Sequence, residues 1–158
     1  MSISNFSASR IVNNTPAGIA DYVQNVSGVS LAMSGVSGVY GSTISAYKIT
    51  GAGYTFDASS GSIPVLSISG NIAFTAEVTD SRGRKATKVV GIDVLAYSPV
   101  SVSNIAAYRS DASKNPADEG VFATLRAKMV VGSLDGQNAG SVQGRVYEKG
   151  TTAPGWTT

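Results

Sequence analysis

The 158-residue sequence contains neither cysteine nor histidine. The absence of cysteine excludes disulfide bonds, thiolate metal sites and a nucleophilic thiol. The absence of histidine removes Ser–His–Asp triads, imidazole metal ligands and the usual general base near neutral pH. The composition therefore predicts a protein that is not an enzyme and that has no metal or other cofactor.

Charge and long apolar runs are also scarce. Charged residues make up 14% of the chain, against about 25% in an average globular domain, and the net charge is only +2, from 12 cations and 10 anions. This excess is too small to indicate a nucleic-acid-binding surface. No apolar run is long enough for a transmembrane helix, and the first residues do not form a signal peptide. We therefore expect no nucleic-acid partner and no membrane association.

What the sequence does contain is alternation of apolar and polar residues. The alternation is clear in residues 29–34, 47–50, 72–79 and 89–94, and a period of two is typical of half-buried β-strands. Segments rich in glycine and serine separate these runs at intervals of about ten residues, which favours an antiparallel β-sandwich. We expect an all-β protein.

One hairpin is especially clear in the sequence. Two alternating runs flank the short segment Asp80–Arg84. Gly83 can adopt a positive φ, and the Asp80 carboxylate can accept hydrogen bonds from backbone amides across the turn. The sequence therefore predicts a β-hairpin with Asp80 and Gly83 in its turn.

The pattern divides the chain into four parts. Residues 1–20 are polar and irregular and are expected to be a lead-in, with one short edge strand near Ile3–Phe6. Residues 21–96 are expected to form an antiparallel β-sandwich, and residues 97–99 a linker, because proline interrupts the strand pattern. Residues 100–158 offer only about three strands, too few for an independent domain. This second β unit is expected to be truncated, or to be completed by the first unit or another chain.

A cluster of cations and one aromatic residue are the candidate interaction surface. The hairpin and the run after it carry Arg82, Arg84, Lys85 and Lys88, which is four of the twelve cations. The cluster could bind an anionic polymer such as a phosphate chain of the cell wall, or it could be a charged hairpin tip that protects a sheet edge from pairing. Trp156 could serve as a contact for a sugar or a protein, or pack in a core.

The acidic residues suggest no catalytic pair. Asp111, Asp118 and Glu119 follow one another in a loop and could form a calcium site, because calcium takes clustered oxygen ligands. The same residues also suit a solvated turn that leads into a strand. Tyr97, beside Pro99, is expected to pack at the junction between the two units.

Five segments occur in an order that characterises one protein family. They are Ile44–Thr50 (ISAYKIT), Ala76–Ala86 (AEVTDSRGRKA), Val94–Pro99 (VLAYSP), Tyr108–Asp111 (YRSD) and Ala117–Gly120 (ADEG). The sequence resembles, over residues 20–158, the immunoglobulin-like and fibronectin-III-like segment of minor structural tail proteins. These proteins belong to long-tailed phages and prophages of Gram-positive bacteria. The resemblance implies that residues 21–96 form an immunoglobulin-like sandwich and that residues 100–158 form a fibronectin-III-like unit. It also implies a virion component near the tail tip or tail fibre, and it supplies no catalytic residues.

Three functions remain open from the sequence. The first is a structural spacer or docking module of a phage tail, made in the host cytoplasm, that binds other tail proteins or itself through an exposed strand edge. The second is a bacterial surface adhesin, and the third is a carbohydrate-binding accessory module of a wall-active protein. The last two have the host cell-wall polymer as their partner.

Overall fold

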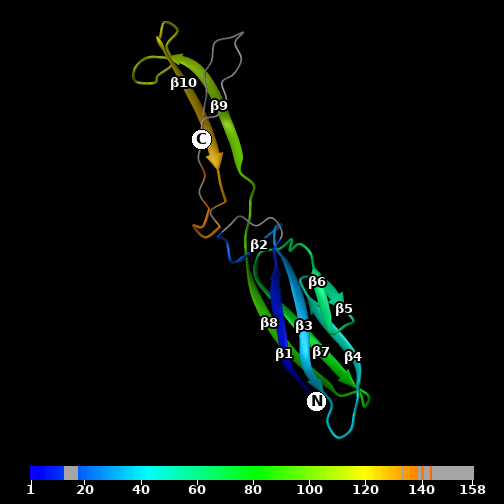
Figure 1. The fold of residues 1–158 in the computed structure, drawn as a ribbon. Helices are drawn as coiled ribbons and strands as arrows, with labels where there is room; N and C mark the ends of the chain where they lie inside the picture. Colours follow the sequence, from blue (N-terminus) through cyan, green and yellow to red (C-terminus); the bar gives the residue numbers. More distant parts are fainter. Residues whose placement is uncertain (13–17, 133, 139, 141–142, 144–158) are drawn as a thin grey trace. The chain divides into compact units, whose positions relative to one another are not determined.

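A computed structural model describes residues 1–12, 18–132, 134–138, 140 and 143 of the chain (Figure 1). The described residues are all-β and contain no helix, and hence no helix that is long and apolar enough to span a membrane. The ten strands are β1 (Ser2–Ile11), β2 (Tyr22–Val23), β3 (Gly28–Ser37), β4 (Ile44–Gly51), β5 (Tyr54–Phe56), β6 (Ser60–Ile63), β7 (Gly70–Asp80), β8 (Lys85–Leu95), β9 (Ser101–Ser110) and β10 (Phe122–Val130).

The chain forms two compact units. Unit 1 comprises Met1–Ser98 together with Leu134–Gln137, and the described residues of unit 2 begin at Pro99. The return of residues 134–137 to unit 1 differs from the continuous second unit expected for residues 100–158. It has a physical cause, because Leu134 is buried in a small cluster with Ile19 and Val23.

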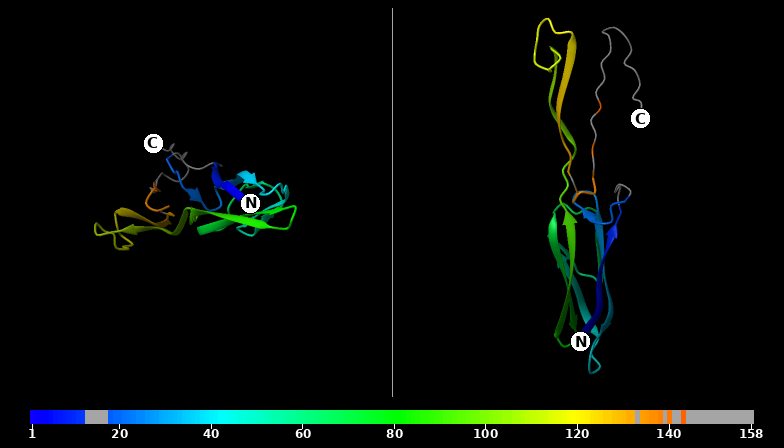
Figure 2. Two further views of the ribbon diagram at one scale, coloured as in Figure 1. Left: turned by 90° about the horizontal axis from the view of Figure 1, so that it is seen from below. Right: turned by 90° about the vertical axis from the view of Figure 1, so that its left-hand side faces the viewer.

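Unit 1 is a β-sandwich of two sheets. One sheet has the strand order β1-β3-β6, and the other has the order β2-β8-β7-β4-β5. All neighbouring strands are antiparallel except β2, which runs parallel to β8. Figure 2 shows the two sheets as separate layers, and side chains from both layers form one hydrophobic core.

The core follows the alternation read from the sequence. Every second residue of β7 is buried, from Ile72 to Val78, and the inward residues of β3 face them across the sandwich. Phe74 and Leu31 are completely buried. Burying a side chain of this size contributes about 1.5–3 kcal/mol, so these few positions supply a large part of the stability of unit 1.

The structure differs from the sequence interpretation in the first 20 residues. Instead of a lead-in with a short edge strand, β1 is a ten-residue strand that pairs with β3 along its length. Ile3 and Phe6 are both buried in the core. They lie three residues apart, opposite Val36 and Met33, so the burial of this strand does not follow a period of two.

The described part of unit 2 is a two-stranded antiparallel sheet of β9 and β10. Its register shifts between Arg126 and Lys128, and Asn104 in the facing strand has a positive φ of 51°, as expected at a β-bulge. None of the buried hydrophobic residues belongs to the described part of unit 2. The third strand expected near residues 142–146 falls, apart from Gln143, outside the described residues.

Candidate functional site

The turn between β7 and β8 is the hairpin expected from the sequence. The backbone N–H of Asp80 donates to the carbonyl of Arg84 (2.9 Å), and the N–H of Gly83 donates to the carbonyl of Asp80 (2.9 Å). Gly83 has a φ of +78°, which glycine adopts without steric cost. The predicted roles of Asp80 and Gly83 in this turn are confirmed.

The Asp80 side chain lies at the centre of the turn and is fully buried. Its Oδ1 accepts hydrogen bonds from the backbone N–H groups of Arg82 (3.0 Å) and Arg84 (2.9 Å). Its Oδ2 accepts one from Arg84 Nε (2.9 Å) and forms an ion pair with Arg84 Nη2 (2.6 Å). Each carboxylate oxygen therefore has two donors, so the buried charge is compensated.

The donors also determine the protonation state of Asp80. Burial acts to raise the pKa of this carboxyl, but the hydrogen bonds from the side chain and backbone of Arg84, from Ser42 and from the backbone of Arg82 outweigh it. The pKa of Asp80 therefore lies far below its ordinary value, and the group stays ionised at any physiological pH.

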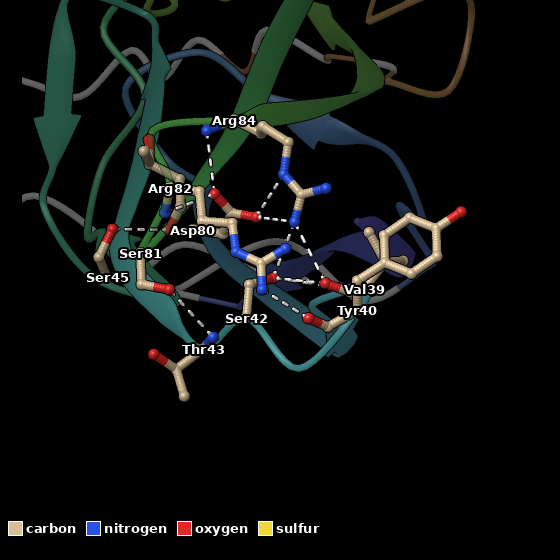
Figure 3. Close-up of polar contacts among 10 residues, drawn as sticks. Val39, Tyr40, Ser42, Thr43, Ser45, Asp80, Ser81, Arg82 and Arg84 are labelled. Carbon is tan, nitrogen blue, oxygen red and sulfur yellow. Dashed lines mark hydrogen bonds and ion pairs between the residues drawn. The ribbon is translucent and has the colours of Figure 1, made fainter.

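The two arginines of the hairpin also bind the loop between β3 and β4 (Figure 3). Arg84 Nη2 donates to the Val39 carbonyl (3.2 Å) and to Ser42 Oγ (3.0 Å), and Arg82 Nη2 donates to the Tyr40 carbonyl (2.7 Å). We call Asp80, Arg82 and Arg84, with their partners in this loop, the hairpin network. The network fastens together two turns that lie about 40 residues apart in the sequence.

The remaining cations of the candidate cluster also have partners within unit 1. Lys85 Nζ forms an ion pair with Glu77 Oε1 (2.9 Å), and Lys88 Nζ donates to the Ser4 carbonyl (2.6 Å), joining β8 to β1. Two of the four positive charges are thus paired with carboxylates and two bind carbonyl oxygens. The surface carries an excess of two charges rather than four, which weakens its attraction for a polyanion.

Comparison with known families decides the origin of the chain. Residues 1–139 match the family described as siphovirus protein of unknown function (DUF859). The chain belongs to this siphovirus family. The match includes the first 19 residues, where the sequence alone offered no resemblance. No curated protein and no solved structure matches the chain.

In this siphovirus protein, the acidic loop after β9 forms a hydrogen-bonded turn. Asp111 Oδ1 accepts a hydrogen bond from the backbone N–H of Asn115 (3.0 Å), and this bond lowers the pKa of Asp111 although burial acts against it. Among the described residues no three acidic side chains are grouped as metal ligands. The calcium hypothesis for Asp111, Asp118 and Glu119 therefore gains no support from their placement.

The same loop borders an open pocket of about 310 Å³ in unit 2 of the siphovirus protein. Among the described residues that line the pocket, Asp111 is the one carboxylate, and Lys114 and Phe122 also border the space. Hydrolysis of a glycoside needs two carboxylates that face each other. The described lining thus offers one carboxylate where this chemistry requires two.

Tyr97 and Trp156 are the two aromatic residues that the sequence singled out, and only Tyr97 lies among the described residues. Tyr97 is half-buried against the cluster of Ile19, Val23 and Leu134 inside unit 1, and its backbone N–H donates to Gln24 Oε1 (3.3 Å). Trp156, the other candidate contact residue, lies outside the described residues.

Sequence reasoning missed half of the hairpin network. The acceptors in the β3–β4 loop are mainly the carbonyls of Val39 and Tyr40. Because every residue type has a backbone carbonyl, the sequence does not reveal which carbonyl accepts such a bond. Ser42 is one of many serines in the chain. A sequence pattern could indicate the hairpin, but not the loop that its arginines bind.

Proposed function

We propose that the chain is a non-enzymatic structural module of a siphovirus tail, located near the tail tip or fibre in a phage or prophage of Gram-positive bacteria. The observation that carries this proposal is the match of residues 1–139 to a siphovirus family, combined with a sandwich whose conspicuous polar residues bind one another. The module acts as a spacer or docking element, and its partners are other tail proteins or a second copy of itself.

The strand order supports an immunoglobulin-like assignment for unit 1. The sheet of β1, β3 and β6 faces a sheet in which the hairpin β7-β8 lies beside β4 and β5. The N-terminal part of unit 1 contributes to both sheets: β1 pairs with β3 in one sheet, and β2 lies beside β8, the last strand of unit 1, in the other. This distribution agrees with the immunoglobulin sandwich, in which strands A, B and E face strands G, F, C and C′.

The contacts of the hairpin network suit a mechanical role. A spacer must keep its loops and its first strand attached when its ends are displaced. The two arginines hold the β3–β4 loop to the β7–β8 turn, and Lys88 holds β1 to β8. Charged hydrogen bonds of this kind contribute about 1.5–3 kcal/mol each where they are shielded from water and less where they are exposed.

Labelling of intact virions tests the proposed location. Antibodies raised against the purified chain are applied to phage particles and located by electron microscopy, with antibodies against a capsid protein as the control. We expect labels on the tail, concentrated toward the end that contacts the host. Labels on the capsid, or a protein that is present in infected cells but absent from washed particles, would contradict the proposal.

A binding assay separates the spacer from the wall-binding alternative. The wild type and a variant with Arg82→Gln, Lys85→Gln and Lys88→Gln are incubated with purified host cell walls. Arg84 is left intact because it compensates the buried charge of Asp80. For a spacer we expect little retention of either protein. Strong retention of the wild type that the triple variant loses would instead identify a wall-binding module.

A further inference from the structure

The first and the last strand of the segment Met1–Ser98, β1 and β8, point in the same direction. Both begin at the end of unit 1 that carries the hairpin network (Figure 1): β1 begins opposite Ser37, next to the β3–β4 loop, and β8 begins just after the β7–β8 turn. The two strands lie next to each other. Ser2 and Ser98 are therefore at opposite ends of unit 1.

A pull between Ser2 and Ser98 acts along the strands. The interstrand hydrogen bonds of an antiparallel pair are perpendicular to the strands, so this pull loads the whole ladder between β1 and β3 at once. A pull that separates Ser2 from Ser37, its partner in the register, acts across the strands and breaks the same ladder one pair at a time. The same bonds therefore resist the first pull together and the second pull singly.

The strand β1 has no second register in which it could settle after slipping along β3. Ile3 and Phe6 are both buried in the core. A slip of two residues is the smallest that keeps the same side chains facing the core, and it would bring Asn5 to the place of Ile3 and Ala8 to the place of Phe6. The first change buries a polar amide and the second leaves a cavity, and both are unfavourable. Sliding must therefore remove the two apolar side chains from the core in one step.

Lys88 joins the two strands that a lengthwise pull drives apart. Its Nζ donates to the Ser4 carbonyl at 2.6 Å, so β8 holds β1 although the two strands belong to different sheets. Within its own sheet β1 has one neighbour, β3, whereas β8 lies between β7 and β2. We therefore expect β1 to yield first, and Lys88 is the side chain that delays it.

We propose that unit 1 is a load-bearing module, which resists tension along its strands and yields readily to a pull across one end. The inference rests on the proposed structural function and adds the direction in which the module carries force. A spacer that is held at its two ends is loaded along the line that joins them. In unit 1 this line follows the strands, so the load falls on hydrogen bonds that act together.

Single-molecule force measurements on the full chain test this direction. Because the chain has no native cysteine, handles can be attached through thioether bonds to two introduced cysteines. Ser2→Cys with Ser98→Cys loads unit 1 along its strands, and Ser2→Cys with Ser37→Cys loads it across them; all three positions are exposed. At the same constant force, we expect the first pair to stay folded at least about tenfold longer, because further hydrogen bonds must break in the same step.

Equilibrium unfolding in urea provides the control for these two variants. Their free energies of unfolding should be equal, because each carries two substitutions at exposed positions of the same fold. Forced unfolding depends on the barrier along the direction of the pull, so a difference in lifetime then reports the direction of the force. Equal lifetimes, or a shorter lifetime along the strands, would overturn the proposal.

Two lysines of β8 test whether β1 yields first. Lys88→Met keeps the apolar stem but removes the bond to Ser4, and it should shorten the lifetime along the strands by about threefold to tenfold. Lys85→Met, the matched control, removes an ion pair with Glu77. This pair joins β8 to β7, which stay together at this step, so the lifetime should not change. No effect of Lys88→Met, or equal effects of both substitutions, would overturn the role assigned to β1.

Failure of this inference is distinguishable from failure of the proposed function. Lifetimes that do not depend on the direction of the pull would overturn the load-bearing role, and labelling of the tail in intact virions would still support a structural module. Directional resistance in a protein whose labels lie on the capsid would support the load-bearing fold and contradict its place in the tail.

Discussion

Truncation of Phe6 tests whether β1 is an integral part of the sandwich. Phe6 is 5% exposed and packs in the main core, and replacing a buried phenylalanine with alanine costs about 3–5 kcal/mol. Because β1 is at the edge of its sheet, its neighbours can partly fill the cavity, so we expect the lower end, about 3 kcal/mol. At about 4–8 °C for each kcal/mol in a domain of this size, the melting temperature should fall by about 12–24 °C.

The measurement is urea unfolding followed by far-ultraviolet circular dichroism. Tyr40→Ala is the matched control, since it also removes an aromatic ring, but one that is 85% exposed. The control should change the free energy of unfolding by less than about 0.5 kcal/mol. If Phe6→Ala is as mild as the control, β1 does not contribute to the core, and the interpretation of residues 1–20 as a lead-in is restored.

Two further predictions concern the hairpin and a close backbone contact. Because the pKa of Asp80 is lowered in the folded state, its contribution to stability is complete above the unfolded pKa of about 3.9 and declines as the pH falls below it. The melting temperature is measured between about pH 7 and pH 2. As the pH falls, it should drop more steeply in the wild type than in Asp80→Asn, because this variant is already less stable at pH 7. The control Asp57→Asn, which changes an exposed carboxylate, should retain the wild-type pH profile. Gly28→Ala should cost about 1–3 kcal/mol, because the added Cβ would collide with the carbonyls of Ile63 (2.6 Å) and Pro64. Gly91→Ala, where the nearest atoms are 4.0 Å away, should be neutral or stabilising by up to about 1 kcal/mol; equal effects at both glycines in urea unfolding would show that the contact is not tight.

The sequence indicated those parts of the fold that depend on local patterns. The alternation from Ile72 to Val78 became a strand with every second residue buried, because a strand inside a sandwich presents one face to the core. The turn at Asp80 and Gly83 was also evident, since both residues act within a few positions of themselves. These features need no knowledge of distant segments.

The parts that the sequence did not indicate depend on distant contacts. The strand β1 is rich in serine, and its buried residues Ile3 and Phe6 are three positions apart, so no period of two marked it. Leu134 joins unit 1 through contacts with Ile19 and Val23, more than 100 positions earlier. Similarly, the cations of the hairpin resembled a binding surface because their intramolecular acceptors come from other strands and loops.

The two units therefore differ in how completely their apolar and charged side chains are paired or buried within the described structure. In unit 1 the apolar side chains share one core and the buried carboxylate has four donors. In the described part of unit 2 the strands pair with each other, but one face keeps its apolar side chains in water. A surface whose charged groups already have intramolecular partners gains little free energy from binding another molecule. An exposed apolar face, in contrast, gains about 25 cal/mol of binding free energy for each Å² that becomes buried. We therefore expect that a partner of this siphovirus protein, if sought, binds the exposed apolar side chains of β9 and β10 rather than the cationic hairpin.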